Sequence, residues 1–141
     1  MDLCCFNRPF DDQVQQKIYL ETEAKLFIQD KIKRKFFNLV WSYMLDYENF
    51  ANPDPEARIS IYKWRKLATI NIIASNKTLN NANIFHKKGF GVKDSIHIAC
   101  AIEAKAKYFL TVDKGILKRR MDVDKTRIIN PIEFIQMEDK I

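Results

Sequence analysis

The chain has 141 residues, with 24 Lys or Arg and 18 Asp or Glu, so its formal net charge at pH 7 is +6. Hydrophobic residues make up 47% of the chain and charged residues 30%, a composition that argues against disordered and fibrous proteins. The length predicts a single domain over residues 1–141. No apolar run approaches the ~18 residues of a membrane span, and the first residues lack the basic start of a signal peptide. We therefore expect a cytoplasmic protein that does not act at a membrane.

The cysteines favour the same compartment. Cys4 and Cys5 are adjacent, Cys100 is distant, and an odd number of cysteines implies no disulfide framework. No Cys-x-x-Cys pair offers ligands to zinc. We expect buried, reduced thiols.

Apolar residues recur with helical and strand periods along the chain. After a short apolar opening stretch, the segment 13–34 has a helical period, and Asp11 or Asp12 can cap it. Pro53 and Pro55 end one helix and begin the next. The predicted elements, in chain order, are helix 13–34, strand 36–41, a helix to about residue 50, a helix from 55 to about 67, strand 70–74, helix 78–87, turn 89–91, helix 92–106, strand 108–112, helix 113–121 and strand 127–129. Strands that alternate with helices predict an α/β fold, with a parallel sheet covered on both faces.

Four acids occupy places where such a fold puts its chemistry. Open parallel sheets carry their functional groups at the carboxyl ends of strands. Asp113 directly follows a predicted strand, Glu48 lies soon after another, Asp94 lies in the first turn of an apolar helix, and Asp2 heads the chain. Like charges gathered in one cleft repel each other, so they require a cation or some protonated members. Oxygen ligands alone favour Mg²⁺ or Mn²⁺ over zinc.

Five segments, in their order and spacing, form a pattern typical of a known family. They are Asp2-Leu3-Cys4-Cys5-Phe6-Asn7-Arg8-Pro9-Phe10-Asp11-Asp12, then Ser42 with Glu48 six residues on, Asn52-Pro53-Asp54-Pro55, Asp94 at the head of its Ala-rich helix, and Phe109-Leu110-Thr111-Val112-Asp113-Lys114. Together they resemble the PIN domain family, and within it the VapC-like toxin ribonucleases. The resemblance covers nearly the whole chain.

The resemblance implies a PIN-like three-layer α/β/α fold with a central parallel sheet of about four to five strands. It implies a metal-dependent endoribonuclease that hydrolyses phosphodiester bonds of RNA, with Asp2, Glu48, Asp94 and Asp113 as the catalytic acids. Asp2, Asp94 and Asp113 would hold Mg²⁺ or Mn²⁺, and Thr111 would support the site through its hydroxyl. It further implies the toxin of a type II toxin–antitoxin system, whose cognate antitoxin covers the cleft. Homodimers are common among similar proteins.

The start of the chain departs from the family pattern. Leu3 stands where the family carries Thr or Ser, and only Met1 precedes Asp2, where the family has most of its central strand. We therefore expect the first strand to be truncated, either by a misassigned start or as a property of this chain. Arg8, which follows the first motif, is the candidate for binding substrate phosphates.

Each acid also has a purely structural interpretation. Asp113 can cap the next helix, and Asp94 is favoured at a helix N-terminus by the dipole. Glu48 can lie on a solvated helix surface, with Asp46 as the inward acid instead, and Asp2 can lie at a frayed terminus.

Two other functions remain open. A non-catalytic PIN-like module that binds nucleic acid or protein is the main alternative to the ribonuclease. A receiver-type signalling domain would need a late Lys-Pro pair, and this chain has Asn130-Pro131 there.

His97 has two interpretations. It lies three residues after Asp94 and can face the same cleft, but its strongly apolar helix favours a hydrogen-bonded histidine in the core.

Overall fold

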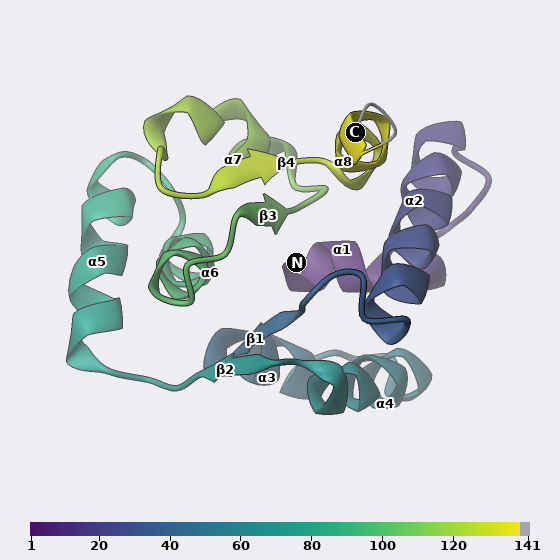
Figure 1. Cartoon of the computed structure of the whole chain (residues 1–141), viewed down its shortest axis with the longest axis horizontal. Coiled ribbons are helices and arrows are strands. Elements are labelled where there is room, and N and C mark those ends of the chain that lie inside the picture. The colour runs from purple at the N-terminus through teal and green to yellow at the C-terminus, as the bar shows by residue number, and fades with distance from the viewer. Residues whose placement is uncertain (139–141) are drawn as a thin grey trace.

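Short parallel strand pairs, packed between helices, form the framework of the protein (Figure 1). The computed structural model describes residues 1–138, without the side chains of residues 3 and 4. The helices are α1 (Leu3–Asn7), α2 (Gln16–Lys33), α3 (Tyr43–Phe50), α4 (Pro55–Lys63), α5 (Asn76–Lys87), α6 (Val92–Glu103), α7 (Lys114–Lys118) and α8 (Pro131–Glu138). The strands are β1 (Val40–Ser42), β2 (Ile70–Ile72), β3 (Tyr108–Leu110) and β4 (Arg127–Ile129). Single 3-10 turns lie at Arg8–Phe10, Trp64–Leu67 and Arg120–Asp122.

The strands form two parallel pairs. β1 pairs with β2 in the register Val40 to Ile70, and β3 pairs with β4 in the register Tyr108 to Arg127. The predicted α/β class with parallel pairing is confirmed. The expected continuous sheet of four to five strands is not found in residues 1–138, because no main-chain hydrogen bond joins β1 to β3.

Helices cover both faces of the β3–β4 pair. Leu110 and Ile129 pack into a core cluster with side chains of α2 and α8, such as Ile28 and Phe134. Their strand neighbours alternate to the opposite face, where Phe109 packs against α6 and α7. A third cluster joins α3, α5 and α6 around Cys100, Met44 and Ala82, with Ile72 of β2 packed against it.

The chain begins with a helix where part of a strand was expected. Asp2 has an extended backbone, and its Oδ1 accepts a hydrogen bond of 3.1 Å from the Cys5 N–H. This N-cap satisfies a free backbone donor of the first turn, so the residues after Asp2 are helical in α1. In the described chain no strand precedes α1.

Local capping moves several predicted boundaries. α2 begins at Gln16 and not at residue 13, because the Asp12 carboxylate accepts from the Val14 N–H and closes a separate turn. The strand predicted at residues 36–41 begins only at Val40, because Lys35 has a φ of 64° and the Phe36 N–H bonds back to the α2 carbonyl of Lys31.

No helix was predicted after residue 129, although Pro131 suits either a turn or the start of a helix. In the structure Pro131 is the first helical residue, where its missing N–H costs nothing. Asn130 caps the helix, since its Oδ1 accepts from the Ile132 N–H at 2.8 Å.

The predicted buried thiols are present at two of three positions. Cys5 and Cys100 are buried and free, and burial raises the pKa of each thiol to about 12. The side chain of Cys4 lies outside the described residues. Among the described helices, none combines the length and apolarity that crossing a bilayer requires.

Candidate active site

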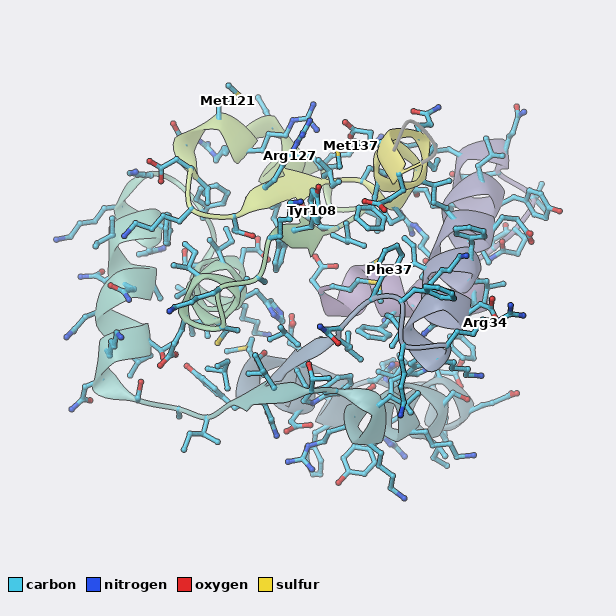
Figure 2. All side chains as sticks on the ribbon, viewed as in Figure 1. Arg34, Phe37, Tyr108, Met121, Arg127 and Met137 are labelled. Atoms are coloured by element: carbon cyan, nitrogen blue, oxygen red, sulfur yellow. The ribbon has the colours of Figure 1, made fainter. Side chains whose placement is uncertain are left out.

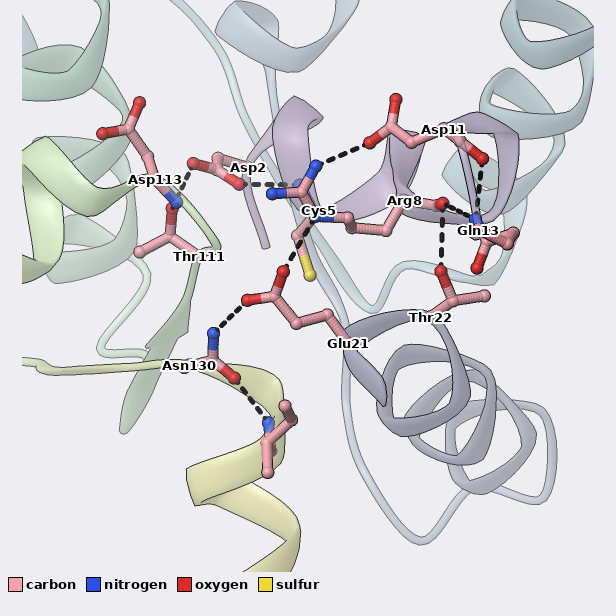
Figure 3. A network of polar contacts seen from close by, with 11 residues as sticks. Asp2, Cys5, Arg8, Asp11, Gln13, Glu21, Thr22, Thr111, Asp113 and Asn130 are labelled. Carbon is pink, nitrogen blue, oxygen red and sulfur yellow. Dashed lines mark hydrogen bonds and ion pairs between the residues drawn. The ribbon is translucent and has the colours of Figure 1, made fainter. Parts of the chain in front are cut away.

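Asp2 and Asp113 are linked through one hydroxyl at the carboxyl end of β3. The Thr111 Oγ1 donates to Asp2 Oδ2 at 2.5 Å and accepts from the Asp113 N–H at 3.0 Å (Figure 3). Thr111 and Asp2 are both buried. The Asp113 carboxylate caps α7, accepting from the N–H groups of Gly115 and Ile116. Asp113 therefore caps α7, as its structural interpretation predicted, and the Thr111 hydroxyl also links it to Asp2.

Glu48 approaches the same region from α3. Its Oε1 contacts Nε2 of His97, which is buried on α6 one turn after Asp94. Asp46, the rival inward acid, lies elsewhere: its Oδ1 accepts from Trp41 Nε1 at 2.9 Å, and its other oxygen pairs with Arg65. Glu48 is therefore the α3 acid that faces α6.

The four acids form one electrostatic unit, which we call the acid cluster (Asp2, Glu48, Asp94 and Asp113). The pKa of Asp94 is raised first by burial and then by the negative charges of Asp113, Asp2 and Glu48, while His97 opposes this rise. Burial likewise raises the pKa of Asp2, against the lowering influence of the Thr111 hydroxyl. Carboxyls from distant parts of the chain are therefore near enough for the charges of Asp2, Glu48 and Asp113 to influence Asp94.

The donor chemistry of the acid cluster suits a hard divalent cation, since every donor is a carboxylate oxygen. The side-chain positions do not complete a ligand set: across residues 1–138, no three His, Cys, Asp or Glu side chains are arranged to hold a metal ion. The reason lies in their partners. Both Asp2 oxygens accept hydrogen bonds, Glu48 contacts His97, and Asp113 is engaged with α7.

Cations lie beside two of these acids. Lys93 directly precedes Asp94, is exposed, and has its Nζ 5.5 Å from the ring centroid of Tyr47. Lys114 directly follows Asp113 and is also exposed.

Arg8, the candidate for binding substrate phosphates, is engaged inside the protein. Its Nε donates to Oε1 of Glu21 at 3.0 Å, and its NH1 pairs with Asp11 at 2.7 Å. The other Glu21 oxygen accepts from Asn130 Nδ2 at 2.5 Å (Figure 3). This network, defined by Arg8, Glu21 and Asn130, joins the end of α1 to α2 and to the cap of α8.

Sequence reasoning missed Glu21, whereas the expected buried position of His97 is confirmed and its partner, Glu48, was not predicted. Glu21 has no exposed surface, yet it lies in a helix whose sequence is mostly polar, so no local signal separates it from surface acids. His97 offered a signal, because it lies three residues after Asp94 and so shares a helix face with it.

The acid cluster is joined to Thr111 through Asp2 and to His97 through Glu48. It combines carboxyls of raised pKa with a buried imidazole, the kind of environment that marks functional sites. Compared with family models, with curated proteins and with solved structures, the chain matches none of them.

Proposed function

We propose that this protein is a metal-dependent endoribonuclease with a PIN-like fold. The observation that carries the proposal is the acid cluster: burial first, and then three carboxylates from other parts of the chain, raise the pKa of the half-buried Asp94. Like charges accumulated at a cleft cost stability, and proteins retain such clusters mainly where charge is needed for function.

The proposed cofactor is Mg²⁺ or Mn²⁺, held by Asp2, Asp94 and Asp113. Their carboxylate oxygens are the kind of donor that these ions prefer. When bound, such an ion polarises a phosphoryl oxygen and lowers the pKa of bound water. Occupation would require the acids to exchange some of their present partners, because both oxygens of Asp2 already accept hydrogen bonds.

The chain's own residues would orient these acids. The Thr111 hydroxyl and the Cys5 N–H fix the two oxygens of Asp2, and the first turn of α7 fixes Asp113. The contact with His97 holds Glu48 toward α6, the helix that carries Asp94. Three of the four acids, Asp2, Glu48 and Asp113, are therefore held by a partner outside the cluster.

RNA is the proposed substrate. A net charge of +6 favours a polyanionic partner. Lys93 and Lys114 are exposed and adjoin Asp94 and Asp113 in the sequence, and in this proposal they would hold phosphates of the RNA. As the toxin of a toxin–antitoxin pair, the protein would be inhibited by an antitoxin that places a basic side chain among the acids.

The test is cleavage of structured and unstructured RNA by purified protein, with Mg²⁺, with Mn²⁺ and with EDTA. Asp94→Asn is the test variant, and Asp124→Asn is the matched control because Asp124 is an exposed acid in a loop. We expect EDTA and Asp94→Asn to abolish cleavage, while Asp124→Asn retains it. Cleavage that survives EDTA or Asp94→Asn would refute the proposal.

A second readout separates metal binding from activity. Mn²⁺ should raise the midpoint of thermal unfolding of the parent and of Asp124→Asn, but not of Asp94→Asn.

The contact between Glu48 and His97 favours one alternative function, because it occupies the acid that a nuclease needs free. That alternative is a non-catalytic PIN-like module, and RNA binding without cleavage in either metal would support it.

A further inference from the structure

Exposed lysines gather in the segments that lead into the strands. They are Lys33 and Lys35 before β1, Lys63 and Lys66 before β2, and Lys105 and Lys107 before β3. Across residues 1–138 no ion pair includes any of these lysines. Two acids near them pair with arginine instead, Asp30 with Arg34 and Asp46 with Arg65. The amino ends of the strands therefore carry an excess of positive charge.

The two strand pairs present these ends side by side. In the first pair, the parallel register places Val40, which opens β1, opposite Ile70, which opens β2. Phe37, just before β1, and Tyr108, the first residue of β3, both pack edge-on against Phe134, with ring centroids 5.3 and 5.1 Å away (Figure 2). The lysines ahead of β1, β2 and β3 therefore come from neighbouring segments, and we call the surface that they form the basic face.

Aromatic rings lie among the lysines of the basic face. Lys33 has its Nζ 5.2 Å from the ring centroid of Trp64, a contact that joins the segment before β1 to the segment before β2. Lys107 has its Nζ 5.4 Å from the ring centroid of Tyr108. Lysines interleaved with aromatic rings are the composition with which proteins bind single-stranded nucleic acid.

Phe36 is the ring on this face that is open to a ligand. Its side chain is 67% exposed, and Lys31 Nζ lies 4.8 Å from the ring centroid. The turn that carries it is ordered, because Lys35 takes a φ of 64° and the Phe36 N–H donates to the Lys31 carbonyl at 2.9 Å. A large ring held on a hydrogen-bonded turn loses little conformational freedom when a base stacks on it.

The basic face and the acid cluster lie at different ends of the strands. Lys107 comes directly before β3, whereas Asp113 follows it. Lys35 comes before β1, whereas Glu48 lies in α3, which follows β1. The basic face therefore contains none of the acids, and it is also separate from Lys93 and Lys114.

We propose that the basic face binds single-stranded nucleic acid, with its lysines on the phosphates and Phe36 stacked on a base. A single strand offers phosphates and unpaired bases along one chain, which suits lysines that alternate with rings. A duplex keeps its bases stacked on one another, so it could not use Phe36. A bilayer surface would favour a continuous apolar area, which the lysines interrupt here. The proposal does not require the acid cluster to be a nuclease.

The test is fluorescence anisotropy of labelled oligo-uridine and oligo-thymidine of about 12 nucleotides, measured with the full chain in EDTA. We expect the double variant Lys35→Gln, Lys66→Gln to raise the Kd at least about fivefold. It should also make the plot of log affinity against log salt shallower by about 1.4, because two phosphate contacts are lost. The matched control is Lys17→Gln, Lys77→Gln, which removes the same charge from exposed positions of α2 and α5 and should raise the Kd less than about twofold.

Phe36 tests the stacking separately from the charge. Phe36→Ala should raise the Kd at least about fivefold and leave the salt dependence unchanged, whereas Phe36→Trp should retain binding. Binding of either oligonucleotide in this way supports the proposal, and the tighter of the two identifies the preferred sugar.

Three results would overturn the proposal. The first is an equal loss in the two lysine double variants, since binding would then follow net charge alone. The second is an unchanged Kd in Phe36→Ala, or a duplex bound as tightly as the single strand. The third is binding to vesicles of phosphatidylserine and phosphatidylcholine without binding to either oligonucleotide. EDTA prevents metal-dependent cleavage throughout, so failure here is distinct from failure of the proposed nuclease function.

Discussion

Lys25 is a buried cation whose replacement should stabilise the protein. Its side chain lies on α2 with 3% of its surface exposed, and no ion pair among the described residues includes it. Its Nζ lies 5.4 Å from the ring centroid of Phe6, a cation–π contact that offsets part of the desolvation. Burial lowers the pKa of Lys25 from 10.5 to about 8, against the opposing influence of Cys5. We expect Lys25→Met to raise the free energy of unfolding at pH 7.

The size and sign of this effect follow from proton linkage. A pKa of about 8 in the folded state against 10.5 in the unfolded state, at ~1.4 kcal/mol per pH unit, corresponds to about 3 kcal/mol. Below pH 8 both states are protonated and the full cost of the buried charge destabilises the fold. Between pH 8 and 10.5 the unfolded state binds more protons, so the cost falls as pH rises. The same linkage leaves less than about 1 kcal/mol at pH 10.

Urea unfolding of the parent and of Lys25→Met at pH 7 and pH 10 measures this difference directly. Lys17→Met is the matched control, because Lys17 is exposed on the same helix and should change stability by less than about 0.5 kcal/mol. Titration of Cys100 is common to all three proteins, whereas that of Cys5 is coupled to Lys25 and changes in Lys25→Met. If Lys25→Met raised the free energy of unfolding equally at both pH values, the proton linkage would be refuted. If it gave no increase at pH 7, the stability cost assigned to the buried charge would be refuted.

Three further predictions concern the network and the acid cluster. Glu21→Ala should cost about 3–5 kcal/mol in urea unfolding, because it leaves buried polar partners unpaired, whereas Glu23→Ala on the exposed side of α2 should cost less than about 0.5 kcal/mol. Thr111→Val removes the hydroxyl that lowers the pKa of Asp2, so an NMR titration should find that pKa higher still, and an unchanged value would contradict the assigned bond. Asp94→Asn should stabilise the protein at pH 7, where the charged carboxylate is repelled by its neighbours. At pH 3 the carboxyl is mostly protonated in the folded and in the unfolded state, because this pH is below the ordinary pKa of 3.8, so the substitution should have no such effect there. Thermal unfolding measured across this pH range checks the sign.

Local patterns predicted the elements that carry strong local signals. The apolar period of α6 and the short apolar run of β3 identified both elements, and the placement of Asp94 and Asp113 beside them followed from the chain order alone. The parallel pairing followed from the alternation of strands with helices, because such connections leave little other choice.

Features that depend on distant partners were not predictable. Glu21 is buried because Arg8 and Asn130 reach it from the two ends of the chain, and nothing within α2 announces either partner. The split of the sheet into two pairs depends on what lies between β1 and β3, which is a property of three-dimensional packing and not of either strand's residues.

The acid cluster and the Arg8 network are joined by one helix, α1. At the start of α1, the Asp2 N–H bonds to the Leu110 carbonyl of β3, and the Asp2 carboxylate accepts from the Thr111 hydroxyl. Just after its end, Arg8 is held by Glu21 of α2. The position of Asp2 in the acid cluster therefore depends on contacts at both ends of α1, so a substitution that breaks the Arg8 network should disturb the acid cluster as well as the packing of α2.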